Sequence, residues 1–354
     1  MKATIILEDK TMLTGCSFGA QGTVFGELVF NTSMSGYQNI VSDPAYTGQI
    51  LAMTYPEMGV YGINKADFEN KKAHIKGFIC KKYNPFYSNF MAETSLGEYF
   101  KKNNVIALDG IDTRSLVKKL RDAGAMSCLI TTEEVTKDMF KALKNYKPQT
   151  YFPEISTEKK YSLGEGKVKL AFIDYGTNDD ILNKLVGLGV NIEVYPANAS
   201  ADEILNSGNC ALFLSNGAGD PREYKAELET IKKLIGKIPI YAMSFGCTLI
   251  GLALGATVEK LGHGHRGANH PVINLDNETV MLTTQSHGYV LDKQTLTDGM
   301  KVTYSNLNDG SVEGFECSKL NIKAVQFLPE KIIPEGSEDI FASWVADMEN
   351  NYVR

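Results

Sequence analysis

Residues 168–256 alternate short apolar strands with amphipathic helices, and this alternation limits the fold of the chain more than any other feature. Four apolar segments have the length of buried strands: "VKLAFI", "VNIEVYP", "CALFLS" and "IPIYAM". The segments between them carry helix signals, such as the acidic start and glycine stop of "NDDILNKLVGLG". The sequence therefore predicts an α/β domain with a mostly parallel sheet and helices on both faces. Ligands of such sheets gather at the carboxyl ends of the strands, here "DYGTND", "SNGAGDP" and "MSFGC".

The rest of the 354-residue chain has a different pattern, which predicts a second domain. Its first part is β-rich, with a hairpin expected around residues 8–10. One clear helix follows in "GIDTRSLVKKLRDAGAM", where Asp112 or Thr113 can cap the start and Gly124 suits the end. Apolar periodicity is lost between Lys147 and Lys167. We therefore expect a β-rich domain over residues 1–150, a linker over 151–167 and the parallel α/β domain over 168–354.

Composition and charge exclude several classes of protein. Hydrophobic residues make up 43% of the chain and the net charge is -6, so the chain can bury a sizeable core and has no dense basic stripe for nucleic acid. Its six cysteines are scattered singly, as in proteins of a reducing compartment. The N-terminal "MKATIILEDK" is too short in apolar residues for a signal peptide or a membrane span. We expect a soluble cytoplasmic protein that binds neither nucleic acid nor membrane.

The segment "YAMSFGC" has the form of a nucleophile elbow, a tight strand-to-helix turn with a reactive side chain at its apex. Ser244 holds the apex and Gly246 is the small residue that follows it. Gly217 and Gly219 lie at the end of the preceding strand, where their amides can approach a substrate and donate to an oxyanion. The spacing alone leaves two hypotheses open, a catalytic serine and a structural one.

Six further motifs occur in one order along the chain: "TSMSGYQ", "SDPAYTGQI", "GIDTR", "GHRGANHPV", "TTQSHGY" and "AVQFLPE". With them, nearly the whole chain resembles the small subunit of carbamoyl-phosphate synthetase. The resemblance implies an N-terminal domain particular to that subunit, largely at the contact with a large subunit, and a class I glutamine amidotransferase domain. It also implies a cysteine thiolate that attacks the side-chain amide of glutamine and releases ammonia to the large subunit. That subunit binds ATP and Mg²⁺, and we expect no cofactor in this chain.

The sequence departs from this family at the positions that carry the chemistry. Ser244 stands at the position of the cysteine. A helix N-terminus can lower the thiol pKa of about 8.5 into the working range, whereas a hydroxyl stays protonated without a base. Leu328 stands at the position of the histidine base in the family's His-Pro-Glu stretch, and a leucine cannot accept a proton. Glu330 matches the family's glutamate, but there is no imidazole for it to orient.

The positions that hold glutamine in the family are altered as well. Ala45, Thr248 and Ser286 replace a serine, a glutamine and an asparagine, and losing several polar partners typically costs orders of magnitude in binding. We therefore expect weak or absent glutamine binding. The other positions of that pocket are Gly217, Gly219, Phe245, Gly288 and Tyr289. The amides of Gly219 and Phe245 do not depend on side chains, so part of an oxyanion hole can survive.

Two other residue arrangements could supply a relocated nucleophile. Cys247 lies in the helix after the elbow, but its side chain is expected to point about one turn away from the apex, and we favour a buried small hydrophobe. A pair of Ser244 and His287 is disfavoured further, because His287 matches an ordinary family position. His263, His265 and His270 lack a carboxylate or cysteine at a recognised metal-binding spacing, so we predict no metal site.

The sequence thus favours a non-hydrolysing small subunit that docks on a synthetase large subunit, in arginine or pyrimidine synthesis. Two alternatives are an active glutaminase with a serine or relocated cysteine nucleophile, and a free-standing regulatory binding protein.

Overall fold

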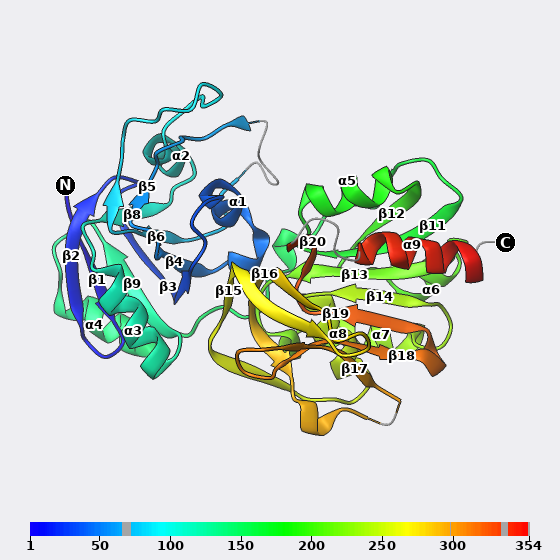
Figure 1. Cartoon of the computed structure of the whole chain (residues 1–354). Helices are drawn as coiled ribbons and strands as arrows, with labels where there is room; N and C mark the ends of the chain where they lie inside the picture. Colours follow the sequence, from blue (N-terminus) through cyan, green and yellow to red (C-terminus); the bar gives the residue numbers. More distant parts are fainter. Residues whose placement is uncertain (66–71, 298, 334–338, 353–354) are drawn as a thin grey trace. The chain divides into compact units, whose positions relative to one another are not determined.

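The computed structural model describes residues 1–65, 72–297, 299–333 and 339–352. The chain divides into two compact units, each described here by itself (Figure 1). The first unit comprises residues 1–149 and 262–266, and the second comprises residues 150–261 and 267–354. Residues 151–167, which the sequence suggested as a linker, fall within the second unit. They include a 3₁₀ turn, η3 (Pro153–Ile155), and a strand, β10 (Tyr161–Leu163).

The first unit is built on a closed barrel with the strand order β1-β2-β8-β6-β4-β3-β9. Its strands are β1 (Lys2–Leu7), β2 (Met12–Ser17), β3 (Thr23–Asn31), β4 (Gln49–Met53), β6 (Gly77–Ile79), β8 (Ile106–Asp109) and β9 (Met126–Thr131). A two-stranded sheet joins β5 (Glu57–Met58) to β7 (Lys82–Tyr83). The helices are α1 (Tyr37–Ser42), α2 (Leu96–Lys102), α3 (Thr113–Ala123) and α4 (Lys137–Asn145), and η1 (Pro44–Tyr46) is a 3₁₀ turn.

Local sequence signals explain two elements of this unit. β1 and β2 form the expected antiparallel hairpin, whose turn places Lys10 at φ 69°. In α3 the side chain of Asp112 accepts from the amide of Ser115 at 3.1 Å, and Gly124 follows the helix at φ 89°. The predicted start and end of this helix are therefore confirmed. Its buried Leu116 and Leu120 pack into a core with one face of the barrel strands.

The second unit is built on an 11-stranded sheet with the order β10-β12-β11-β13-β14-β19-β18-β17-β15-β16-β20. Its strands after β10 are β11 (Val168–Tyr175), β12 (Val190–Pro196), β13 (Ala211–Gly217), β14 (Ile240–Met243), β15 (Val258–Asn274), β16 (Val280–Leu291), β17 (Lys301–Asn306), β18 (Val312–Cys317), β19 (Ile322–Val325) and β20 (Leu328–Ile333). Its helices are α5 (Asp179–Gly187), α6 (Ala201–Leu205), α7 (Lys225–Leu234), α8 (Phe245–Ala253) and α9 (Ile340–Asn351).

The parallel part of this sheet is confirmed, but it is smaller than the sequence suggested. β12, β11, β13, β14 and β19 pair in parallel in that order. β10 pairs antiparallel with β12, and in the flank beyond β19 the pairs β19–β18, β18–β17, β17–β15 and β16–β20 are antiparallel. The flank differs because β17, β18 and β19 follow one another through short connections, and a parallel pairing needs a longer crossover.

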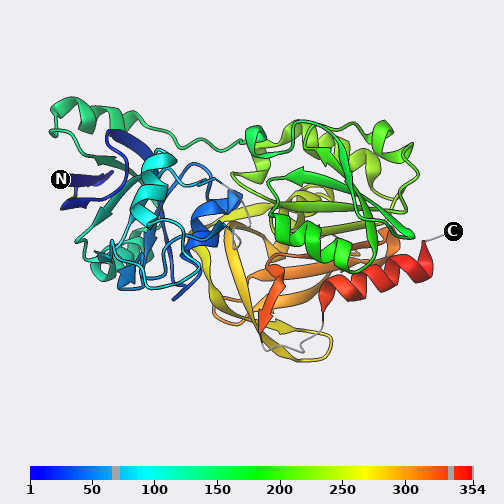
Figure 2. The ribbon, with the colours of Figure 1, turned by 90° about the horizontal axis from the view of Figure 1, so that it is seen from above.

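Helices cover both faces of the parallel region, as predicted. Side chains of α6, α7 and α8 share one core with the inward residues of β11, β13 and β14. Side chains of α5 and α9 share the opposite core, which includes Phe172, Phe213 and Trp344. Figure 2 shows α5 in green and α9 in red on the same side of the sheet. No helix among the described residues is both long and apolar enough to span a lipid bilayer.

Candidate active site

The turn between β14 and α8 has the backbone of a nucleophile elbow. Ser244 lies at its apex with φ 48° and ψ −111°, a backbone conformation that residues other than glycine seldom adopt. Its amide donates to the carbonyl of Val325 in β19 at 2.8 Å, and its own carbonyl accepts from Cys247 at 3.0 Å. The strained turn is thus held by β19 on one side and by the first turn of α8 on the other.

Three glycines near the elbow allow neighbouring main-chain segments to approach each other closely. A Cβ added at Gly246 would lie 2.3 Å from the carbonyl oxygen of Leu214, so α8 begins in direct contact with β13. A Cβ at Gly217 would lie 2.7 Å from the carbonyl oxygen of Tyr175. Gly219 has φ 95°, and a Cβ there would lie 2.3 Å from the carbonyl oxygen of Thr150. Since Phe245 is the first residue of α8, its amide has no acceptor within the helix and suits an oxyanion donor.

Leu328 replaces the base with an apolar contact. It is the first residue of β20, pairs with Thr284 of β16, and is 3% exposed. Its side chain belongs to the same hydrophobic core as Met243, the residue before the elbow apex. Glu330 follows two positions later in β20. Leu328, at the position where the resemblance predicts a base, therefore contributes packing to the core.

The predicted glutamine-pocket positions of the second unit lie in α8 and β16. Thr248 is 1% exposed, and its hydroxyl donates to the carbonyl of Phe245 at 2.8 Å, within its own helix. The ring of Phe245 packs edge-on against Tyr224 with 4.7 Å between centroids. Ser286 is buried, and Gly288 and Tyr289 continue the same strand, β16. A threonine whose donor is used by its own helix cannot replace the longer amide side chain of the family.

Ala45 lies in the first unit. It belongs to η1, is buried, and its amide donates to the Asp43 carboxylate at 2.9 Å. The methyl side chain offers no hydrogen-bonding group where the family has a serine.

Cys247 is not placed as a relocated nucleophile. Its side chain is 1% exposed within the core beneath α8. Burial raises the pKa of the thiol, and the carboxylate of Glu313 raises it further. A raised pKa means less thiolate at any working pH, whereas a catalytic cysteine needs more.

Alkylation with iodoacetamide should therefore distinguish Cys247 from Cys16, which is exposed. In the folded protein between pH 7 and 9 we expect Cys16 to react and Cys247 to stay unmodified, as read by peptide mass spectrometry. Both should react after unfolding in urea, which controls for detection of the peptides. Rapid modification of Cys247 in the folded protein would contradict the assignment of a buried, protonated thiol.

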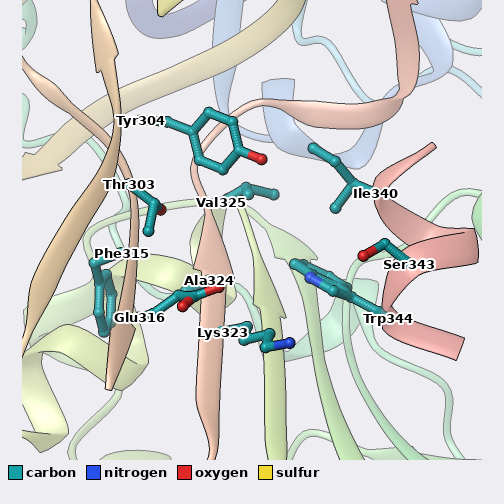
Figure 3. A pocket seen from close by; sticks show the side chains of 10 residues that line it. All are labelled: Thr303, Tyr304, Phe315, Glu316, Lys323, Ala324, Val325, Ile340, Ser343 and Trp344. Atoms are coloured by element: carbon teal, nitrogen blue, oxygen red, sulfur yellow. The ribbon is translucent and has the colours of Figure 1, made fainter. Parts of the chain in front are cut away.

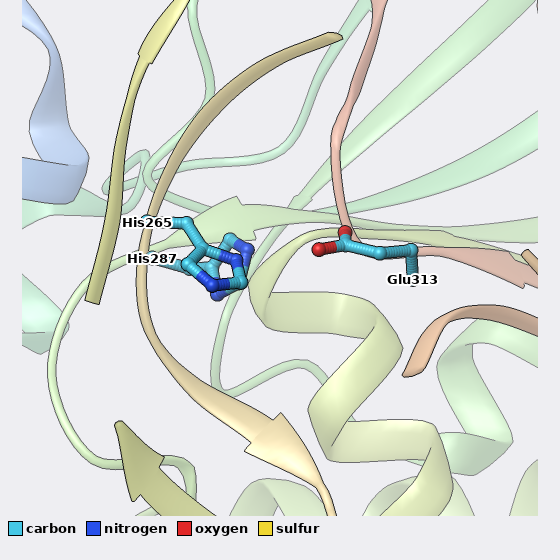
Figure 4. A group of neighbouring side chains, drawn as sticks. All are labelled: His265, His287 and Glu313. Carbon is cyan, nitrogen blue, oxygen red and sulfur yellow. The ribbon is translucent and has the colours of Figure 1, made fainter. Parts of the chain in front are cut away.

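His287 is engaged by its own strand. Its Nδ1 lies 3.1 Å from the carbonyl oxygen of Tyr289, and its Nε2 lies 3.2 Å from Oε1 of Gln285. Because a carbonyl only accepts, Nδ1 carries a proton. Figure 4 shows the imidazole facing Glu313 within the second unit, and a ring nitrogen and a carboxylate oxygen lie within 4.8 Å. His287 is thus held by the main-chain oxygen of Tyr289 and the side-chain oxygen of Gln285.

A small cavity lies next to α9 (Figure 3). It is lined by residues of β17, β18, β19 and α9, among them Tyr304, Lys323 and Trp344. Its volume is about 60 Å³, far below the roughly 300–1,000 Å³ of small-molecule sites. None of the predicted site residues lines it, so this cavity does not serve the elbow.

Two cations beside Tyr289 were missed by the sequence reasoning. The guanidinium of Arg222 lies 5.6 Å from the Tyr289 ring centroid, and the ammonium of Lys260 lies 6.0 Å from it. Arg222 also donates to both carboxylate oxygens of Asp220, at 2.9 and 2.6 Å. These residues come from three distant segments, and nothing in their local patterns links them.

Comparisons with known proteins agree with this architecture. Residues 5–130 match the family model of the carbamoyl-phosphate synthase small chain, CPSase domain, and residues 171–348 match that of glutamine amidotransferase class-I. A carbamoyl phosphate synthase small chain of Clostridium perfringens is 43% identical over 347 residues, covering 96% of this chain and 98% of that protein. The Aquifex aeolicus small chain is 40% identical over 348 residues, covering 93% of each. With both domains matched and relatives aligned over nearly their full length, the chain belongs to the family of carbamoyl-phosphate synthase small chains.

Proposed function

We propose that this chain is a non-hydrolysing small subunit of carbamoyl-phosphate synthase. It binds the large synthase chain in the cytoplasm and leaves that chain to use free ammonia, for arginine or pyrimidine biosynthesis. ATP and Mg²⁺ belong to the large chain in this proposal, and this chain binds no cofactor, nucleic acid or membrane. Binding of glutamine is weak or absent.

The observation that carries the proposal is the joint loss of nucleophile and base on an intact elbow. Ser244 keeps the strained backbone of the apex, but Leu328 supplies only packing to the hydrophobic core. Nucleophile and base act as one unit in such enzymes, so removing either costs nearly as much as removing both. Main-chain amides at the elbow stabilise an oxyanion only where a nucleophile creates one.

The two alternative functions have less support. A glutaminase with a relocated cysteine would depend on Cys247, whose thiol is buried and has a raised pKa. A free-standing regulatory protein would not need the motifs "MSGYQ" and "GIDTR" of the first unit, which are both present. Docking on a large chain accounts for their presence.

The proposal is tested by reconstituting the complex with a large synthase chain and measuring carbamoyl phosphate with one nitrogen source at a time. We expect synthesis from ammonium and a rate from ammonia-free glutamine at least about a thousandfold lower, as for loss of a nucleophile–base unit. The ammonium reaction controls for an active large chain in the same sample. Comparable rates from both nitrogen sources would refute the proposal. Loss of the glutamine-dependent rate alone in a Ser244→Ala or Cys247→Ala variant would then identify the nucleophile.

A further inference from the structure

The cavity beside α9 presents polar groups and aromatic rings to the same small space (Figure 3). Strands β17, β18 and β19 line one side of it, and α9 lines the other. Its polar lining residues are Thr303, Glu316, Lys323 and Ser343, and its aromatic rings include those of Tyr304 and Trp344. All of them belong to the second unit and none belongs to the elbow, so the cavity is independent of the proposed function.

Glu316 is a carboxylate of this cavity without an ion pair. In the sheet it lies directly opposite Lys301 of β17 on one side and Lys323 of β19 on the other. Lys301 already pairs with Asp276. Lys323 pairs with Asp347, with 3.0 Å between Nζ and Oδ2. Within the described ranges no residue forms an ion pair or a hydrogen bond with the Glu316 carboxylate, so one negative charge is left over.

The volume of the cavity limits its ligand to a few atoms. It measures about 60 Å³, and a single water needs roughly 10–15 Å³ of such space, so there is room for roughly four waters. A bare ammonium or metal ion is about the size of one water and would leave most of the cavity unfilled. A molecule of roughly three or four non-hydrogen atoms fills it.

The charge and the lining favour a cation with a short apolar tail. The leftover negative charge repels anions, and the rings of Tyr304 and Trp344 attract cations. Val325 and Ile340 add apolar side chains that are 2% and 3% exposed, which suit a hydrocarbon tail. A divalent metal ion takes several oxygen ligands, usually with more than one carboxylate among them, whereas Glu316 is a single carboxylate.

We propose that this cavity binds a small primary alkylammonium ion. Its ammonium group pairs with the Glu316 carboxylate, and its alkyl chain lies against Val325 and Ile340. The hydroxyl oxygens of Thr303 and Ser343 accept the remaining N–H groups.

The test titrates the full chain with ethylammonium chloride, while sodium chloride keeps the ionic strength constant. Trp344 is the only tryptophan of the chain and lines the cavity, so its fluorescence reports on occupancy. We expect a saturable change with a dissociation constant in roughly the millimolar range, which is what so small a ligand allows. Calorimetry should give the same constant. Sodium acetate, which is of similar size and opposite charge, should produce no saturable change.

Three variants make the test specific to the cavity. Glu316→Gln keeps the shape of the side chain and removes its charge, so ethylammonium binding should weaken at least about tenfold. The matched control is Glu259→Gln, which changes an exposed carboxylate of β15 outside the cavity and should alter the affinity less than about twofold. Ser343→Leu adds bulk to the lining from an exposed position of α9 and should also weaken binding at least about tenfold.

Circular dichroism should show all three variants folded, and Ser343→Leu keeps the test decisive if Glu316→Gln does not fold. A wild-type chain without a saturable response would overturn the inference, and so would equal affinity of Glu316→Gln and the wild type. Saturation by acetate or by glycine at a similar concentration would also overturn it, because the cavity would then select an anion or a zwitterion. None of these outcomes changes the proposed function, which is tested by the nitrogen source.

Discussion

Changing Ser244 to cysteine and Leu328 to histidine together should restore glutamine hydrolysis, whereas either change alone should leave the rate at background. The elbow backbone, Gly246 and the amide of Phe245 are already in place, so the double variant adds a nucleophile and its base to existing geometry. We expect ammonia release at least about a hundredfold above the parent, the lower end of what a positioned general base contributes. Glutamine-dependent ammonia release from the purified chain, and from its complex, measures this.

Three controls make this result specific. The first control is Leu328→Gln combined with Ser244→Cys. Glutamine is polar and of similar size to histidine but cannot serve as a base, so ammonia release from this variant should stay at the parent's rate. Adding Cys247→Ala to the active double variant should leave its rate unchanged, because Cys247 lies buried in the core. Restoring the family residues at Ala45, Thr248 and Ser286 should lower KM for glutamine at least about tenfold. Background activity in a folded double variant would show that the site has lost more than the nucleophile and base.

Replacing Gly246 with alanine should destabilise the second unit by about 3 kcal/mol. The added Cβ would lie 2.3 Å from the carbonyl oxygen of Leu214, and main-chain atoms of a central strand cannot move aside cheaply. The chain has a single tryptophan, and Trp344 packs in the core of the second unit, so its fluorescence during urea unfolding reports on that unit. The midpoint of this transition should fall accordingly.

Gly187→Ala is the matched control in the same unit. Gly187 is the last residue of α5, and an added Cβ there meets nothing within 4 Å. Alanine in a helix is favoured over glycine by roughly 0.5–1 kcal/mol, so this variant should be unchanged or slightly more stable. Equal midpoints for Gly246→Ala and the wild type would contradict the close approach of α8 to β13.

Much of the fold was predictable because its signals are local. Asp112 and Gly124 mark the ends of α3 through hydrogen bonding and a positive φ, which are properties of single residues. The strands around the elbow were predictable from apolar runs of strand length. The antiparallel flank of the sheet was not, because strand order depends on which distant segments pair.

The site divides in the same way. That Ser244 lacks a thiol and Leu328 lacks a base follows from residue identity alone. The arrangement of Arg222 and Lys260 around Tyr289 joins segments far apart in the chain, so no local pattern contains it.

By itself the sequence determined the succession of strands and helices, the likeness to synthase small chains, and the presence of Ser244 and Leu328 where a cysteine and a histidine were expected, because these depend on residue types and their spacing. The tertiary structure alone decided that the elbow keeps its strained backbone, that Cys247 is buried where the pKa of its thiol is raised, and that Phe86 and Phe90 face outward. Burial and close approach depend on which distant residues pack against each position, and these are properties of the folded chain.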